Sequence, residues 1–166
     1  MGCVEADECF SQGLDAFSKR EFRFAAELFE KAAALDSSNP HYYYYLGISL
    51  RELGDRASAE KHLSHAVSLL PDAAAIRYVR AEIRLENGDF SKAAEDFLYI
   101  TSDESEENRY WKSLSYLGLG LIRIEEGDIE AALTLFSEAE DIARELNDTG
   151  LLSRISSELE KSGFQK

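Results

Sequence analysis

Apolar residues recur along most of the chain at the three- and four-residue spacing of amphipathic helices, with polar residues between them. Short turns rich in Gly, Asp, Asn and Ser interrupt this pattern at regular intervals. The pattern predicts an all-α fold. The nine expected helices lie at residues 7–19, 22–35, 40–53, 56–69, 74–87, 90–102, 107–126, 129–145 and 148–162.

The helical stretches also repeat in pairs. Gly13, Gly47, Ala81 and Gly120 are spaced 34, 34 and 39 residues apart. Three further columns with the same spacings hold Ala25, Ala59, Ala93 and Ala132; Phe29, Leu63, Phe97 and Phe136; and Ala32, Ala66, Ile100 and Ala139. Because one helix pair cannot bury its apolar face alone, the repeated pairs are expected to stack.

The columns have a physical interpretation. A small residue in the first helix lets the second helix approach closely, and a large apolar residue of the second helix fills the space beside the crossing. The dipeptide Gly-Asp ends the first helix and begins the next in three units, at residues 54–55, 88–89 and 127–128. The first unit has Arg20-Glu21 instead, so we expect a different turn there.

These residues resemble the tetratricopeptide repeat, a helix-turn-helix unit of about 34 residues. The second unit matches the family pattern with residues 45–47, 53–55, Ala59 and Ala66, and the resemblance covers about residues 6–145. It implies a right-handed α-solenoid in a single domain, residues 1–166. Its expected repeats are residues 6–39, 40–73, 74–107 and 109–145, followed by a capping helix at 148–162.

Composition and charge narrow the function. The 166 residues include 18 Lys and Arg against 32 Asp and Glu, a formal net charge of −14. So acidic a chain would repel nucleic acid and anionic membranes. The sequence has no apolar run of membrane-spanning length and no secretory signal, so we predict a cytoplasmic protein with reduced Cys3 and Cys9.

The resemblance implies that the first helices of successive units line a groove that binds an extended or helical segment of a partner. The side chains expected there are Phe10, Leu14, Phe17, Tyr44, Tyr45, Ile48, Arg51, Tyr78, Val79, Glu82, Leu85, Leu114, Leu117 and Leu121. With Glu52 and Glu86 beside them, they suit an apolar, partly basic segment. Alternatively, these side chains pack against neighbouring repeats, or residues 1–8 or 162–166 fill the groove.

Two details concern packing. The resemblance implies that an Arg just before the small residue of a first helix pairs with an Asp of the second helix, so Arg80 is expected to pair with Asp96. The alternative is that Arg80 is solvated. Residues 42–45 are four consecutive tyrosines that circle a helix, and we expect Tyr43 to be the core member.

Sequence motifs help to distinguish between the possible classes of function. The chain has no phosphate-binding loop, Cys-x-x-Cys, His-Glu-x-x-His or Gly-x-Ser-x-Gly, so we expect no catalysis, metal or cofactor. Tetratricopeptide proteins that bind chaperone carboxylates use a clamp of Lys, Asn and Arg, and none of the five matching positions here fits it: Phe10, Leu14, Tyr45, Ala75 and Val79. The resemblance therefore favours a protein-binding adaptor. The alternatives are a chaperone like those of type III secretion translocators, and a scaffold that assembles with copies of itself.

Overall fold

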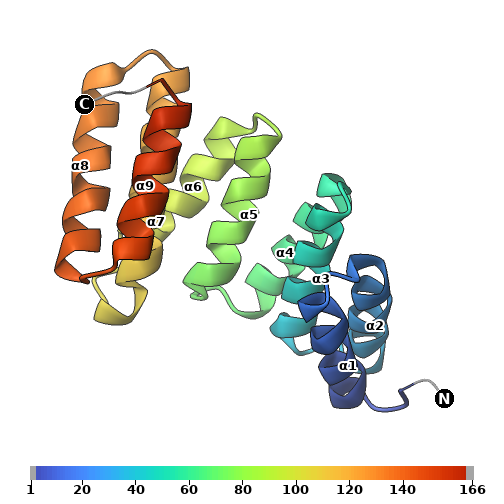
Figure 1. Cartoon of the computed structure of the whole chain (residues 1–166). Helices are drawn as coiled ribbons and strands as arrows, with labels where there is room; N and C mark the ends of the chain where they lie inside the picture. Colours follow the sequence, from blue (N-terminus) through green and yellow to red (C-terminus); the bar gives the residue numbers. More distant parts are fainter. Residues whose placement is uncertain (1–2, 164–166) are drawn as a thin grey trace. The chain divides into compact units, whose positions relative to one another are not determined.

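The computed structural model describes residues 3–163, and within that range the chain is helical without strands (Figure 1). The elements are α1 (Ala6–Ser18), α2 (Phe22–Leu35), α3 (Pro40–Glu52), α4 (Arg56–Leu69), α5 (Ala74–Glu86), α6 (Phe90–Thr101), a 3₁₀ turn (Glu106–Asn108), α7 (Arg109–Glu125), α8 (Ile129–Glu145) and α9 (Thr149–Lys161). The predicted all-α fold is confirmed. The largest difference in bounds is at α7, because the 3₁₀ turn occupies the start of the stretch predicted to be helical.

The chain divides into two compact units, Met1–Ile83 and Arg84–Lys166. Unit 1 holds α1 to α4 and most of α5, and unit 2 holds the end of α5 and α6 to α9. In unit 1, α1 packs against α2, α2 against α3, and α3 against α4 (Figure 1). The single domain expected from the sequence stays a prediction.

The small and large residues of the repeat columns meet as predicted. A Cβ atom on Gly13 would lie 2.6 Å from the Phe29 ring, and one on Gly47 would lie 2.7 Å from the side chain of Leu63. At Gly120 the ring of Phe136 is closer still. In each case the helix pair approaches so closely that the first helix has no room for a side chain at its crossing point.

The turns inside the repeats use glycine for its backbone freedom. Gly54, Gly88 and Gly127 adopt φ angles of +84°, +79° and +81°, the left-handed region that ends a helix. The following aspartate caps the next helix in two of the turns. The side chain of Asp55 accepts the backbone N–H of Ser58 at 3.1 Å, and Asp128 does the same for Ala131 at 3.1 Å.

The two cysteines differ from the prediction. Cys3 and Cys9 form a disulfide with a Cα–Cα distance of 5.1 Å, and both are buried in the core of unit 1. The expectation of reduced thiols rested on the absence of a secretory signal and took no account of the path of the residues before α1, which brings Cys3 to Cys9 at the start of that helix. Lys31 of α2 donates a hydrogen bond to the carbonyl of Cys3, which holds this segment in place. Disulfides are typical of proteins in oxidising compartments. The cytoplasmic location predicted from the sequence stays a prediction.

Tyr42 supplies a polar link between α3 and α1. Its ring is 1% exposed, and its hydroxyl donates a hydrogen bond to Asp7 at 2.6 Å. The expectation that Tyr43 is the core member was wrong, because Tyr43 is only half-buried and lies against His62 and His65 of α4. The pattern of four tyrosines contains no apolar stripe from which to choose.

We expect the substitution Tyr42→Phe to lower the free energy of unfolding by about 1–2 kcal/mol, since it removes a hydrogen bond to a carboxylate. The hydrogen bond to Asp7 raises the pKa of Tyr42 above its ordinary value of about 10. The folded state therefore holds this proton more tightly than the unfolded chain, and the stabilisation is complete below pH 10 and lost as the pH rises through the raised pKa. Urea unfolding of both proteins at pH 8 and above pH 11 measures this; a gap that persists at the higher pH would contradict it.

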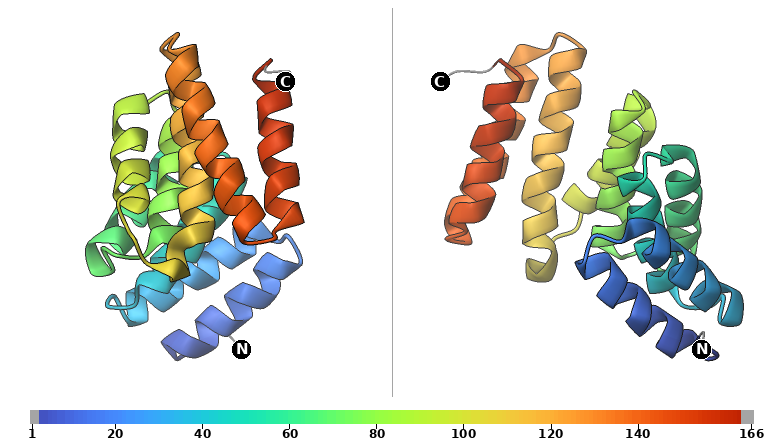
Figure 2. Two further views of the ribbon diagram at one scale, coloured as in Figure 1. Left: turned by 90° about the vertical axis from the view of Figure 1, so that its left-hand side faces the viewer. Right: turned by 45° about the vertical axis from the view of Figure 1, so that its right-hand side comes forward.

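In unit 2, α7 packs between α6 and α8, and α9 packs against α8 and α7 (Figure 2). A Cβ atom on Gly118 would lie 2.5 Å from the Phe97 ring of α6. The stripe expected on the capping helix is buried, through Leu151, Ile155 and Leu159. Asp148 caps this helix by accepting the N–H of Leu151 at 2.9 Å.

Candidate protein-interaction surface

Six of the predicted groove residues lie on two neighbouring first helices of unit 1, and all six are half-buried. We call this set the α1–α3 surface: Phe10, Leu14, Phe17, Tyr44, Tyr45 and Ile48. Phe10, Leu14, Phe17 and Tyr45 also pack against the core of unit 1. These four side chains are therefore anchored in the core while part of their surface stays exposed, and their role in a binding groove stays a prediction.

Ring contacts fix the aromatic members in position. Tyr45 is the centre of the network, with ring centroids 5.5 Å from Phe10, 5.9 Å from Phe17 and 5.5 Å from Phe29 of α2. Tyr44 lies at the edge, 5.2 Å from Tyr45. Burial, followed by the nearby groups Tyr45 and Glu82, raises the pKa of Tyr44. A tyrosine hydroxyl with its ordinary pKa of about 10 is already neutral at physiological pH, so the upward shift leaves Tyr44 able to donate to a ligand.

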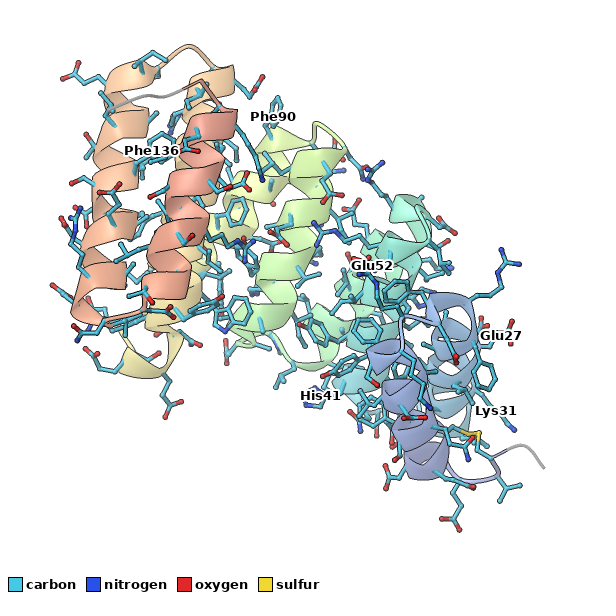
Figure 3. All side chains as sticks on the ribbon, in the orientation of Figure 1. Glu27, Lys31, His41, Glu52, Phe90 and Phe136 are labelled. Carbon is cyan, nitrogen blue, oxygen red and sulfur yellow. A yellow bond between two sulfur atoms is a disulfide. The ribbon has the colours of Figure 1, made fainter. Side chains whose placement is uncertain are left out.

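A polar bridge next to this surface changes the expected electrostatics. Arg51 of α3 forms an ion pair with Glu82 of α5 at 3.0 Å, and the hydroxyl of Tyr78 donates to the same carboxylate at 2.8 Å. The charge of Glu82 is thus compensated by Arg51. Glu52, which is exposed at the end of α3 (Figure 3), keeps the acidic character predicted for this edge.

Four of the predicted groove residues are buried. Tyr78 is 5% and Val79 8% exposed, and Leu114 and Leu117 of α7 are 0% and 3% exposed. A buried side chain cannot contact a ligand in this conformation, so these four contribute to packing. The periodic pattern identifies the inward face of a helix but not how many neighbours cover it. The remaining two, Leu85 and Leu121, are half-buried in unit 2.

Asp96 is the most deeply buried carboxylate of unit 2, at 1% exposure. Arg84 forms an ion pair with it at 3.0 Å, from a side chain that is itself 12% exposed. The pair expected between Arg80 and Asp96 joins residues of different units and stays a prediction. Arg80 donates a hydrogen bond to Ser64 at 3.4 Å.

The alternative that the chain ends fill the groove concerns in part residues 1–2 and 164–166, which lie outside the described residues. Of the other residues in that alternative, Cys3 is held in the core of unit 1 and residues 6–8 form the start of α1.

Sequence reasoning missed a second surface, at the turn between α1 and α2. Arg20, Glu21, Phe22, Arg23, Phe24 and Leu53 line a hollow of about 450 Å³ there. We call it the turn pocket. The departure from Gly-Asp at residues 20–21 was its signal in the sequence, but that departure predicted only a different turn.

The model of the tetratricopeptide repeat family matches residues 10–64 and 46–107. Human tetratricopeptide repeat protein 7B is 29% identical over 101 residues, which are 61% of this chain and 12% of that protein. The chain therefore spans about an eighth of the length of this relative.

Solved structures share the fold. The structure of MamA superposes with a TM-score of 0.79 at 20% identity, covering 86% of this chain and 80% of that one. YrrB, described as a tetratricopeptide protein with an unusual peptide-binding site, gives 0.74 at 22% identity, covering 92% and 74%. The Yersinia enterocolitica type III secretion chaperone SycD, solved with a peptide of the translocator YopD, gives 0.68 at 15% identity, covering 72% and 93%.

Among residues 3–163, no helix is both long and apolar enough to cross a membrane. The family model spans more than half of the chain, and the small-to-large contacts of the helix pairs are those predicted from the repeat columns. The chain belongs to the tetratricopeptide repeat family.

Proposed function

We propose that this protein is a non-catalytic adaptor that binds a segment of another protein on the α1–α3 surface. The observation that carries the proposal is the network of half-buried rings on α1 and α3. Tyr45 is fixed by three ring contacts, and Tyr44 stands beside it at 5.2 Å. Rings that are already held in place lose little conformational freedom on binding, which favours recognition.

The charge of the chain sets the chemistry of the segment. With a net charge of −14, the protein attracts basic ligands over long range. Close to the surface, Arg51 compensates Glu82, while Glu52 is exposed. The proposed ligand is therefore an apolar segment whose basic residues flank its apolar centre. YrrB, a protein with an unusual peptide-binding site, and SycD, solved with a peptide of YopD, support a protein ligand.

The test is the substitution Tyr44→Glu, because Tyr44 is at the edge of the network and Tyr45 is needed for the core. Short labelled peptides with an apolar centre and lysine flanks, and matched peptides with serine at the centre, serve as probes in fluorescence anisotropy. We expect the apolar peptides to bind wild type, and Tyr44→Glu to weaken binding at least about tenfold, the loss expected for a buried aromatic contact.

The matched control is Tyr99→Glu, which makes the same change at a tyrosine of α6 that is 43% exposed. It should bind like wild type. Circular dichroism must show both variants folded. If Tyr44→Glu binds as tightly as wild type, or if the serine peptides bind equally well, the proposal is wrong.

The two alternatives are distinguished by further measurements. A translocator chaperone would prefer segments of membrane-inserting proteins to generic apolar peptides. A self-assembling scaffold would show a mass in light scattering that increases with concentration, and Tyr44→Glu would return it to the monomer.

A further inference from the structure

The turn pocket combines an apolar wall with exposed aromatic surface. Phe22, Phe24 and Leu53 form the wall, and Phe24 and Leu53 are 52% and 44% exposed. The pocket shares no residue with the α1–α3 surface. A shallow apolar surface of this kind, open to solvent, can contact one large side chain of a partner.

Arg20 has an unusual backbone conformation at this site. Its φ angle is +62°, whereas the equivalent turns of the other three repeats have glycine at this position. A residue with a Cβ atom is disfavoured in this region, and such residues cluster at functional sites. The guanidinium carbon of Arg20 lies 5.9 Å from the centre of the Phe22 ring, at the rim of the pocket. The first repeat therefore has arginine where glycine would fit the backbone with less strain, and the arginine adds a positive charge.

The charge of the pocket is opposite to that of the chain. Two basic residues, Arg20 and Arg23, line it, and Glu21 is the one acidic residue among the lining residues. Within residues 3–163, neither arginine forms an ion pair. On a protein with a net charge of −14, this pocket is a local site that favours an anionic ligand.

A second hollow lies next to the turn pocket. It has a volume of about 270 Å³, shares Arg23 and Leu53 with the turn pocket, and continues past Glu27 and Glu30 of α2. Glu27 points to the side of α2 away from α1 (Figure 3). An acidic segment is therefore confined to the turn pocket, because the second hollow would place carboxylates against it.

We propose that the turn pocket docks an acidic segment of a partner protein. One aromatic or aliphatic side chain of the segment packs on Phe24 and Leu53, and the carboxylates of the segment lie against Arg20 and Arg23. The charge preference is opposite to that of the α1–α3 surface, so the protein holds two different segments. This inference does not depend on the function proposed above.

The probes are a short labelled peptide of aspartates and glutamates around one phenylalanine, the same peptide with lysines in place of the acidic residues, and one with serine in place of phenylalanine. Binding is measured by fluorescence anisotropy at two salt concentrations. Only the first peptide should bind, and binding should weaken as salt increases. Failure of the first peptide to bind, or equal binding of the lysine peptide, would overturn the proposal.

The decisive variant is Arg20→Gly. It removes the charge while relieving the backbone, so it should melt no lower than wild type and yet bind the acidic peptide about tenfold more weakly, as expected for a lost charge-assisted hydrogen bond. Arg23→Glu should weaken binding at least as much. The control Lys19→Gln removes the adjacent positive charge, which is paired with Asp15 and outside the pocket, and should bind like wild type.

Two further outcomes would overturn the proposal. One is unchanged binding of the acidic peptide by Arg20→Gly and Arg23→Glu. The other is self-association of wild type in light scattering that Arg20→Gly abolishes, since the occupant would then be a second copy of this chain. Binding of the lysine-flanked peptides to the α1–α3 surface is measured separately with Tyr44→Glu, so each proposal can fail without the other.

Discussion

Replacing Asp96 by alanine should lower the free energy of unfolding by about 3–5 kcal/mol, the largest effect that we expect of any single substitution. Asp96 is 1% exposed and Arg84, its partner at 3.0 Å, is also largely buried. Removing the carboxylate leaves the guanidinium of Arg84 desolvated without this counter-charge. The penalty comes mainly from that unbalanced charge, because an intact buried pair is itself worth little.

Urea unfolding followed by circular dichroism measures this loss. The control is Glu126→Ala, which breaks the exposed pair of Arg123 and Glu126 in the same unit; the side chains of that pair are 49% and 46% exposed. We expect the control to cost at most about 1 kcal/mol. A loss for Asp96→Ala no greater than that of the control would show that the buried pair does not contribute to stability in this way.

A pair of double-mutant cycles then tests the contact predicted from the sequence. The first combines Arg84→Met with Asp96→Ala, and the second combines Arg80→Met with Asp96→Ala. A coupling energy of about 1–3 kcal/mol in the first cycle is expected from the observed ion pair. Similar coupling in the second cycle would establish the pairing of Arg80 with Asp96.

The helices could be predicted because their determinants are local. The bounds of α2, α4 and α8 agree with those predicted, and each of these helices follows a turn that starts it: Glu21 after Arg20, or an aspartate after glycine. The repeat columns also predicted which small residue faces which large one. Both signals lie within one helix pair, where the spacing of residues along the chain determines which side chains meet.

The parts of the site that depend on contacts between different helix pairs could not be predicted. Arg51 and Glu82 are 31 residues apart and belong to different helix pairs, so no repeat column links them. Leu114 has the periodicity of a groove residue but is fully buried. The disulfide between Cys3 and Cys9 depends on the path of a few residues before α1, which carry no periodic pattern.

Gly120→Ala should destabilise the protein by about 1–3 kcal/mol, although glycine-to-alanine substitutions inside helices usually stabilise by about 0.5–1 kcal/mol. The sign reverses because a Cβ atom on Gly120 would overlap the ring of Phe136, which is itself 3% exposed and has no room to move away. The Phe136 ring fills the space between the closely packed helices α7 and α8. These helices must therefore separate to make room for the methyl group.

Gly150→Ala in α9 is the matched control, since its Cβ atom would meet only the side-chain oxygen of Asp148, at 3.3 Å. Thermal melting should show a melting temperature that is unchanged or higher for Gly150→Ala and lower by roughly 2–10 °C for Gly120→Ala. Adding Phe136→Leu to Gly120→Ala should recover part of the loss, because it removes the ring atoms that the new methyl group meets. Without that recovery, the close approach of α7 and α8 would not be what requires glycine at this position.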